Sequence, residues 1–203
     1  MNTTEGSLPE MIFSESESVI SLNENGMHLA KSGKMKEAED YFLRAIELDP
    51  NYPKSYHNLG IIQTVQHRTK EAIGNFKRLV ELEPHNPEHY NNLGIIYFQE
   101  KSFNESELNF RKALELDKNH VDCLFNLGKL LFNLERVDEA LLLIEQFLEI
   151  DNSNTEAMNV LGMCYLKKND KEKARLIWEK ALDINPGLEE VRKRVQEISV
   201  SSF

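Results

Sequence analysis

The chain has 203 residues, of which 34 are acidic and 24 are basic, so its formal net charge at pH 7 is −10. This acidity disfavours nucleic acid and anionic membrane surfaces as partners, because no basic stripe is available to neutralise phosphate groups. The sequence contains no run of about 18 apolar residues, and we therefore expect no insertion into a membrane.

The first 18 residues precede any regular pattern. They are rich in Ser and Glu and contain the helix breakers Gly6 and Pro9, a composition that predicts a disordered acidic N-terminal tail. The tail lacks a basic stretch followed by an apolar one, so we expect no secretory signal. It also holds one apolar patch, formed by Leu8, Met11, Ile12 and Phe13. The patch either frays, or adds a turn to the first helix, or lies as a tethered segment in the protein's own groove.

After the tail, residue types recur at a spacing of 34 residues. One register holds glycine, at Gly26, Gly60, Gly94, Gly128 and Gly162. A second register holds small residues, at Ala38, Ala72, Ser106, Ala140 and Ala174. A third register holds large apolar residues, at Phe42, Phe76, Phe110, Ile144 and Trp178. A period of this length, held five times without an insertion, predicts a repeat array rather than one globular core.

Each unit of the array is predicted to be a pair of helices joined by a turn. In residues 87–120 the first helix is expected over about 88–100 and the second over about 104–116, because the apolar spacing is helical in both stretches. Small residues let the two helices approach closely, and the large apolar residues fill the space beside them. Proline follows the second helix in three units, where it stops the helix, at Pro50, Pro84 and Pro186.

This motif resembles the tetratricopeptide repeat family over about nine-tenths of the chain. In the second unit it reads Tyr56, Leu59-Gly60, Ala72, Phe76 and Pro84. The resemblance implies an all-α fold, a right-handed superhelical solenoid of five helix-turn-helix repeats with a C-terminal capping helix. The expected boundaries are 1–18 for the tail, 19–52, 53–86, 87–120, 121–154 and 155–188 for the repeats, and 189–198 for the capping helix.

Two units depart from the motif. In the first unit Asn25 stands where later units have leucine, which costs stability in a core unless the amide is hydrogen-bonded. Terminal units of a solenoid meet water on one face, so we interpret this unit as a cap. In the fourth unit the run 140–148 is unusually apolar. That run predicts either bulky packing against the fifth unit or a dimerisation surface around Leu141 and Leu142.

No constellation of residues in the sequence predicts catalysis. There is no Gly-rich phosphate-binding loop, and no spacing of Ser, His and Asp indicates a triad. His85 and His89 are spaced somewhat like a metal-binding pair, but Pro87 breaks the helix that would bring both imidazoles to one face. Cys123 and Cys164 are the only cysteines, and we expect buried, reduced thiols. The sequence therefore predicts no enzyme, no cofactor and no metal, in a cytoplasmic protein.

The resemblance implies that the first helices of successive repeats line a concave groove and that the second helices form the convex back. The sixth position of three successive repeats carries Asn58, Asn92 and Asn126. An asparagine amide both donates and accepts hydrogen bonds, so each could bind one peptide unit of an extended ligand. This ladder resembles the peptide groove of the superhelix attached to O-linked N-acetylglucosamine transferases. The alternative is that asparagine at this position is ordinary family sequence.

Other groove positions are apolar, which marks an interaction surface when such side chains are exposed. The predicted ligand-contacting residues beside the ladder are Asn91, Ile61, Ile95, Phe98, Phe125, Lys129, Phe132 and Asn133. The expected ligand is an extended or helical segment with two or three apolar anchors. The alternative is that these residues pack only between neighbouring first helices.

The sequence thus predicts a non-enzymatic protein–protein interaction scaffold that binds a peptide through an asparagine ladder and apolar pockets. The second hypothesis is a structural building block that self-associates into homo-oligomers through its own repeats. A carboxylate clamp of the kind found in chaperone-binding family members is disfavoured, because the required Lys and Asn positions hold Asn91 and Ile95 in the third unit.

Overall fold

The computed structural model describes residues 18–200, and within that range the chain forms eleven helices and no strand. The contacts divide the chain into two compact units, Met1–Leu82 and Glu83–Phe203. The predicted tail, except for Ser18, and its apolar patch lie outside the described residues. An all-α fold is therefore confirmed for the part of the chain that the structure describes.

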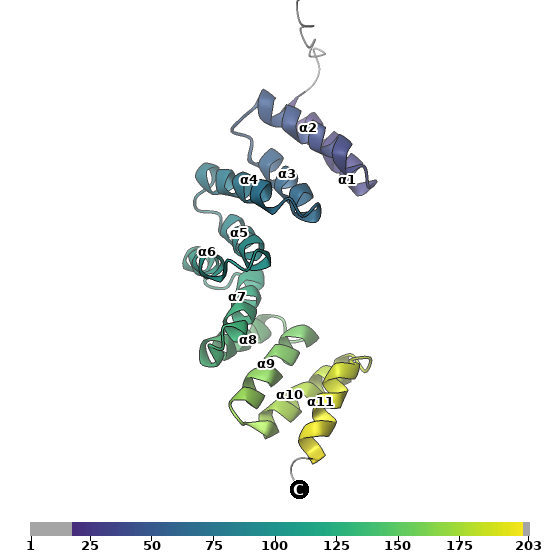
Figure 1. The fold of residues 1–203 in the computed structure, drawn as a ribbon, viewed down its shortest axis with the longest axis vertical. Coiled ribbons are helices and arrows are strands. Elements are labelled where there is room, and N and C mark those ends of the chain that lie inside the picture. The colour runs from purple at the N-terminus through teal and green to yellow at the C-terminus, as the bar shows by residue number, and fades with distance from the viewer. Residues whose placement is uncertain (1–17, 201–203) are drawn as a thin grey trace, which may run out of the picture. The chain divides into compact units, whose positions relative to one another are not determined.

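The first unit contains two helix pairs, which Figure 1 shows in purple to blue-teal. Its helices are α1 (Val19–Lys31), α2 (Met35–Leu48), α3 (Pro53–Val65) and α4 (Thr69–Leu82). Helix α1 packs on α2 and α3 packs on α4, while α3 also contacts α1 and α2. One cluster of buried apolar residues in this unit consists of Ala38, Phe42, Leu59 and Ile62. Asn25 is exposed on α1, as expected for a terminal unit.

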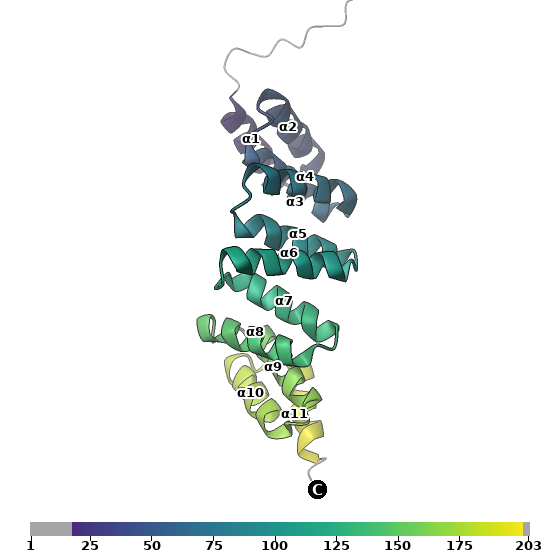
Figure 2. The ribbon, with the colours of Figure 1, turned by 90° about the vertical axis from the view of Figure 1, so that its left-hand side faces the viewer.

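The described part of the second unit forms three helix pairs and one further helix, which follow one another in chain order in Figure 2. Its helices are α5 (Pro87–Gln99), α6 (Phe103–Leu116), α7 (Val121–Asn133), α8 (Val137–Ile150), α9 (Thr155–Lys167), α10 (Lys171–Ile184) and α11 (Glu189–Val200). Side chains cap the first helix of each pair, because Asn86, His120 and Asn154 accept a backbone N–H of the first turn. Helix α7 contacts both α5 and α9, so the first helices of the three pairs are neighbours in chain order.

The glycine register exists because a large apolar side chain of the second helix, aromatic in all repeats but the fourth, lies against the first helix. A Cβ atom added at Gly94 would lie 2.5 Å from the ring of Phe110, and one at Gly60 would lie 2.7 Å from the ring of Phe76. These separations are shorter than real Cβ contacts allow, so glycine is needed for the close approach. Ser106, which stands in the alanine register, donates its hydroxyl to the Gly94 carbonyl at 2.7 Å and is thereby satisfied.

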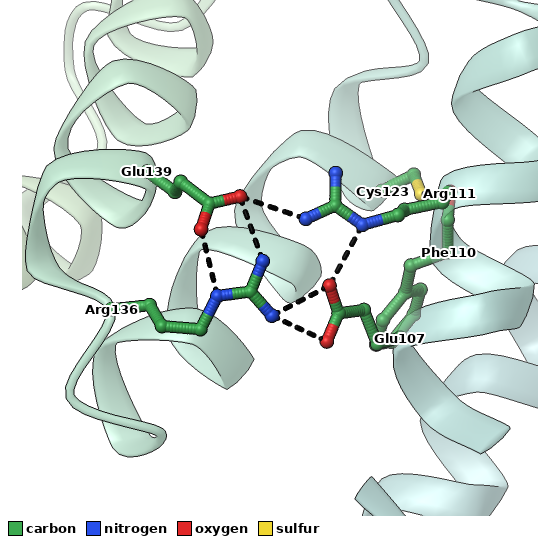
Figure 3. Close-up of polar contacts among 6 residues, drawn as sticks. All are labelled: Glu107, Phe110, Arg111, Cys123, Arg136 and Glu139. Carbon is green, nitrogen blue, oxygen red and sulfur yellow. Dashed lines mark hydrogen bonds and ion pairs between the residues drawn. The ribbon is translucent and has the colours of Figure 1, made fainter. Parts of the chain in front are cut away.

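A network of four charged side chains joins α6 to α8 in the second unit (Figure 3). Arg136 Nη1 donates to both carboxylate oxygens of Glu107, at 2.8 and 2.7 Å, and Arg136 Nε donates to Glu139 at 2.7 Å. Arg111 donates to the same two carboxylates at 2.7 and 2.9 Å. Bidentate, charge-assisted bonds of this kind fix geometry as well as contributing energy. The network therefore sets how the second helices of these two repeats sit together.

A three-residue version of this network, without a counterpart of Arg111, occurs in the first unit, two repeats earlier in the sequence. There Arg68 donates to both carboxylate oxygens of Glu39 at 2.7 Å and also pairs with Glu71. The positions Glu39, Arg68 and Glu71 precede Glu107, Arg136 and Glu139 by 68 residues each. In each unit, this polar contact links two consecutive repeats, and the residues that form it are not part of the 34-residue motif.

Candidate functional site

A pocket of about 260 Å³ lies between α5 and α7 in the second unit. It is lined by Ile95, Phe98, Gln99, Phe110, Asn126 and Lys129. The α5 residues are spaced i, i+3 and i+4, and the α7 residues are spaced i and i+3, so each set shares one helix face. Four of the predicted site residues, Ile95, Phe98, Asn126 and Lys129, are brought together here.

The one charge on the pocket lining is the Lys129 ammonium. Its Nζ atom lies 2.6 Å from Glu156 Oε1 and 4.9 Å from the centroid of the Phe125 ring. Both members of the ion pair are exposed, so the pair contributes only about 0–1 kcal/mol and can exchange partners. The pocket therefore combines apolar walls with one amide and one cation that a ligand can reach.

Two of the three predicted ladder asparagines, Asn58 and Asn126, have hydrogen-bond partners within the protein. Asn126 Nδ2 donates to Asn91 Oδ1 at 3.2 Å in the second unit, and Asn58 Nδ2 donates to Asn23 Oδ1 at 3.2 Å in the first. Each bond joins the sixth position of one repeat to the fifth position of the repeat before it. An amide that gives one N–H in this way keeps its second N–H and its oxygen. Asn58 and Asn126 thus each use one side-chain N–H within the protein, and their other N–H and their oxygen remain available to a ligand.

Three more hydrogen bonds involve an asparagine at the fifth position of a repeat. Asn23 also donates to Val19 O at 2.9 Å and to Ser55 Oγ at 2.8 Å, which satisfies a side chain that is only 3% exposed. At the other end of the chain Arg194 Nη1 donates to Asn159 Oδ1 at 2.7 Å, again over 35 residues. The fifth position therefore serves as an anchor for the next first helix.

Asn91 differs from the expectation that it borders the ligand. Its side chain is 2% exposed, because Asn126 of the following repeat covers it and donates to its amide oxygen. Asn91 therefore holds the Asn126 side chain from its buried side. Asn92, in contrast, is half-buried, and its side chain forms no hydrogen bond within residues 18–200.

The remaining predicted residues of the second unit lie outside the pocket lining. The half-buried Phe125 ring packs on Phe147 with centroids 5.1 Å apart. The Lys167 ammonium lies 5.6 Å from the Phe132 centroid. Asn133 is exposed at the end of α7. Phe132 thus contacts the next first helix, α9, as in the alternative interpretation, whereas Phe125 packs on α8, the second helix of its own repeat.

In the first unit the predicted residues Asn58 and Ile61 line a separate pocket of about 160 Å³. Its other lining residues are Met27, Ala30, Lys31, Phe42 and Ile62. The Ile61 side chain is 45% exposed, so an apolar surface is accessible on α3.

Two residues of the pocket between α5 and α7 were not among the predicted site residues. Gln99 lies one helical turn after Ile95, so the i, i+4 rule could have identified it. Phe110 was predicted only as a core residue of the second helix, yet its ring also reaches the pocket lining. A repeat motif does not show which buried ring also lines a neighbouring pocket.

The described residues also bear on metal binding, thiol reactivity and membrane crossing. Between residues 18 and 200, no three His, Cys, Asp or Glu side chains gather in a way that could hold a metal ion. His89 is buried with Nε2 2.7 Å from Glu83 Oε2, whereas His85 is exposed. Cys123 and Cys164 are free and buried, and burial raises the pKa of their thiols to about 12 and about 11. No helix in the same range is long and apolar enough to cross a membrane.

Comparison with solved structures gives neighbours of the same fold. YrrB, described as a TPR protein with an unusual peptide-binding site, is 24% identical with a TM-score of 0.73, covering 88% of this chain and 92% of that one. MamA from residue 41 onward, from Desulfovibrio magneticus RS-1, is 14% identical with a TM-score of 0.75 and coverages of 84% and 96%. TTC0263, a thermophilic TPR protein from Thermus thermophilus, is 20% identical with a TM-score of 0.63 and coverages of 90% and 100%.

Comparisons of the sequence identify the family more specifically than the structural neighbours do. A search of curated proteins finds no match. Two tetratricopeptide repeat models match residues 19–52 and 41–74. The model of the Cilia and flagella-associated protein 70 middle TPR-like domain matches residues 76–184, which is more than half of the chain. With the helical pairs of both units and the fold neighbours, these matches show that the chain belongs to the tetratricopeptide repeat family, a family of all-α helical repeat solenoids.

Proposed function

We propose that the protein is a non-enzymatic protein-interaction scaffold that binds a peptide segment at the pocket between α5 and α7. The observation that carries the proposal is the pocket itself, where Ile95 and Phe98 meet Asn126 and Lys129. Stacked helical repeats generally present extended binding surfaces. YrrB, which has a similar fold, is described as having a peptide-binding site, and this supports the same class of ligand here.

The size of the pocket argues for one side chain of a longer ligand. Sites for whole small molecules span about 300–1,000 Å³, whereas this pocket measures about 260 Å³. A single large apolar side chain fits against Ile95 and Phe98. The free oxygen of Asn126 then accepts a backbone N–H of the ligand, and a ligand carboxylate near the anchor competes with Glu156 for Lys129.

The asparagine ladder forms part of the same proposal. Asn58 and Asn126 each retain an amide oxygen after donating to the repeat before them, and Asn92 retains its whole amide. Asn92 and Asn126 can therefore contact the backbone of an extended ligand whatever its sequence, and Asn58 offers the same contact within the first unit. Because two of the amides are already oriented by hydrogen bonds, they are positioned before a ligand arrives.

A peptide selection with matched variants tests this function. A library of random peptides is selected on the full chain, and the enriched peptide is titrated against wild type, Ile95→Arg and Leu108→Arg. Arg at Ile95 places a charge against apolar walls and should weaken binding at least about tenfold. Leu108 is 70% exposed on α6, so the same change there should leave the dissociation constant unchanged. Equal weakening by both variants, or by neither, contradicts the assignment.

Self-association is a second candidate function, because three exposed leucines recur at the repeat spacing on the second helices α6, α8 and α10. They are Leu108, Leu142 and Leu176. Exposed apolar residues in such a row can bind a second copy of the chain. Light scattering over a hundredfold concentration range tests this candidate: a constant monomer mass excludes it. A mass that rises in wild type but not in Leu142→Glu supports it.

A further inference from the structure

A second pocket lies on the side of the second helices, between α8, α9 and α10. Its volume is about 320 Å³, and it is lined by Leu148, Met158, Leu161 and Ile177 with Glu145, Glu149 and Lys180. The Met158 side chain is fully buried and forms part of an apolar interior. The pocket shares no lining residue with the site between α5 and α7.

This gap is open because a bridging side chain found at equivalent gaps is missing. Between α6 and α8, Gln146 Nε2 donates to Lys118 O at 3.2 Å and to Asn119 Oδ1 at 3.3 Å. In the first unit Arg78 donates to Asn51 Oδ1 at 3.1 Å from the equivalent position. Lys180 occupies that position on α10, and it forms no hydrogen bond or ion pair within residues 18–200.

The loop residue that could receive such a bridge also differs. Ser153 stands at the position that Asn51 and Asn119 occupy in the two bridged gaps. Its hydroxyl donates to Asp151 Oδ1 at 2.9 Å, and its backbone N–H donates to the same oxygen at 3.2 Å. The Ser153 hydroxyl proton is thus used within its own turn, and nothing among the described residues spans the gap from Lys180.

The wall formed by α8 is acidic. This helix has four carboxylates and no Lys or Arg in its sequence VDEALLLIEQFLEI. Asp138 and Glu139 pair with basic residues, and Glu145 accepts the Tyr165 hydroxyl at 2.5 Å. Glu149 is exposed and has no partner within residues 18–200. Two carboxylates therefore face one ammonium, that of Lys180, across an apolar interior.

We propose that this pocket binds an apolar anchor carried on a cationic segment of a partner protein. The anchor enters between Leu148 and Ile177 toward Met158, and a Lys or Arg beside the anchor pairs with Glu149 and Glu145. The net negative rim selects the sign of the ligand charge, because electrostatic complementarity mainly determines specificity. Exposed Leu142 precedes Glu145 by one helical turn, and Leu176 adjoins Ile177, so a segment longer than the anchor gains further apolar contact.

Methyl NMR on the full chain labelled at methionine ε-carbons tests this proposal, because Met158 reports on the pocket directly. Met158→Leu, which nearly conserves side-chain volume, assigns its signal. The probes are three acetylated peptides: Arg-Arg-Ala-Leu-Ala-Arg-Arg, the same peptide with Ala in place of Leu, and the same peptide with Glu in place of every Arg. The first should shift the Met158 methyl saturably. The Ala peptide lacks the anchor and the Glu peptide lacks the cations, so each should bind at least about tenfold more weakly.

Charge reversal at the rim provides the matched comparison. Glu149→Lys should weaken binding of the cationic Leu peptide about five- to tenfold, because it reverses one exposed ion pair. Glu115→Lys makes the same change one repeat earlier on α6, outside the pocket, and should leave binding unchanged. Ile95→Arg, in the site between α5 and α7, should also leave it unchanged. An unmoved Met158 methyl, equal binding of the anionic peptide, or an unaffected Glu149→Lys variant overturns the proposal.

Discussion

Asn126 donates its side-chain amide to the amide oxygen of Asn91 at 3.2 Å, one repeat apart. The contact between Asn58 and Asn23 has the same length and the same spacing in the first unit. These bonds join first helices of consecutive repeats and leave each donor's oxygen free. One residue position can therefore hold the repeats in register and present a hydrogen-bond acceptor to a ligand.

The anchor asparagine should matter for stability. Asn23→Ala removes a 3% exposed amide that bonds to Val19, Ser55 and Asn58, and it should lower the free energy of unfolding by about 1–3 kcal/mol. Asn25→Ala changes the same residue type in the same helix at an exposed position and should stay within about 0.5 kcal/mol of wild type. Urea unfolding followed by circular dichroism measures both, and equal effects would contradict the anchor role.

The glycine register can be tested with two changes in the first unit. Gly60→Ala places a Cβ 2.7 Å from the Phe76 ring and should destabilise by about 1–3 kcal/mol through overpacking. Gly74→Ala, on α4, meets no atom within 4 Å and should stabilise by about 0.5–1 kcal/mol, because alanine favours the helix. Opposite shifts of the melting temperature are expected, and shifts of the same sign would refute the packing argument.

The charge network predicts a pH dependence. Hydrogen bonds from Arg136 and then Arg111 hold the pKa of Glu139 below its usual range. Burial alone raises the pKa of Glu107, but bonds from Arg111 and Arg136 outweigh it, so this pKa is also lowered. Both carboxylates bind protons more weakly when folded, so their contribution is present above the unfolded pKa of about 4.3 and is lost as pH falls through the folded pKa.

Arg136→Gln should therefore flatten the loss of stability between about pH 5 and pH 3, because the folded pKa values move back toward their ordinary range. Lys112→Gln removes a single exposed pair with Glu115 and should keep a slope close to that of wild type. Guanidinium would screen these charges, so urea unfolding across this pH range is the measurement. A slope unchanged by Arg136→Gln would show that the network does not couple to folding.

The two cysteines should be unreactive while the chain is folded. Burial raises the pKa of Cys123 to about 12, and its Sγ donates to the Phe110 carbonyl at 3.1 Å, so little thiolate forms near pH 8. Ellman's reagent at pH 8 should label both thiols only in denaturant, at the rate of unfolding or local opening. Fast labelling of the native protein would contradict the buried environment.

The sequence predicted the helix pairs well because their determinants are local and periodic. Glycine at one register and a ring at another specify a close helix crossing without reference to anything distant, as Gly94 and Phe110 show. The offsets also placed Ile95, Phe98, Asn126 and Lys129 on one surface. Side-chain depth was not predictable in the same way, since Asn91 is covered by a residue 35 positions later in the chain.

The pocket between α8, α9 and α10 was unpredictable for a related reason. It depends on whether one long side chain reaches across a gap and finds an acceptor, as Gln146 does and Lys180 does not. The repeat motif does not include that position. The pairing of Glu107 with Arg136 likewise could be found only from the contacts, and the same pairing occurs two repeats earlier, between Glu39 and Arg68.

Site-specific cross-linking tests the central claim, peptide binding between α5 and α7, most directly. The photoreactive residue p-benzoylphenylalanine is placed at Gln99, which is exposed and lines the pocket, or at Leu108, which is exposed on α6. Each protein is irradiated with the peptide enriched on wild type, and the adducts are located by mass spectrometry. The account predicts an adduct from position 99 that free peptide competes away, and none from position 108. An adduct from position 108 alone, or none from position 99, would contradict it.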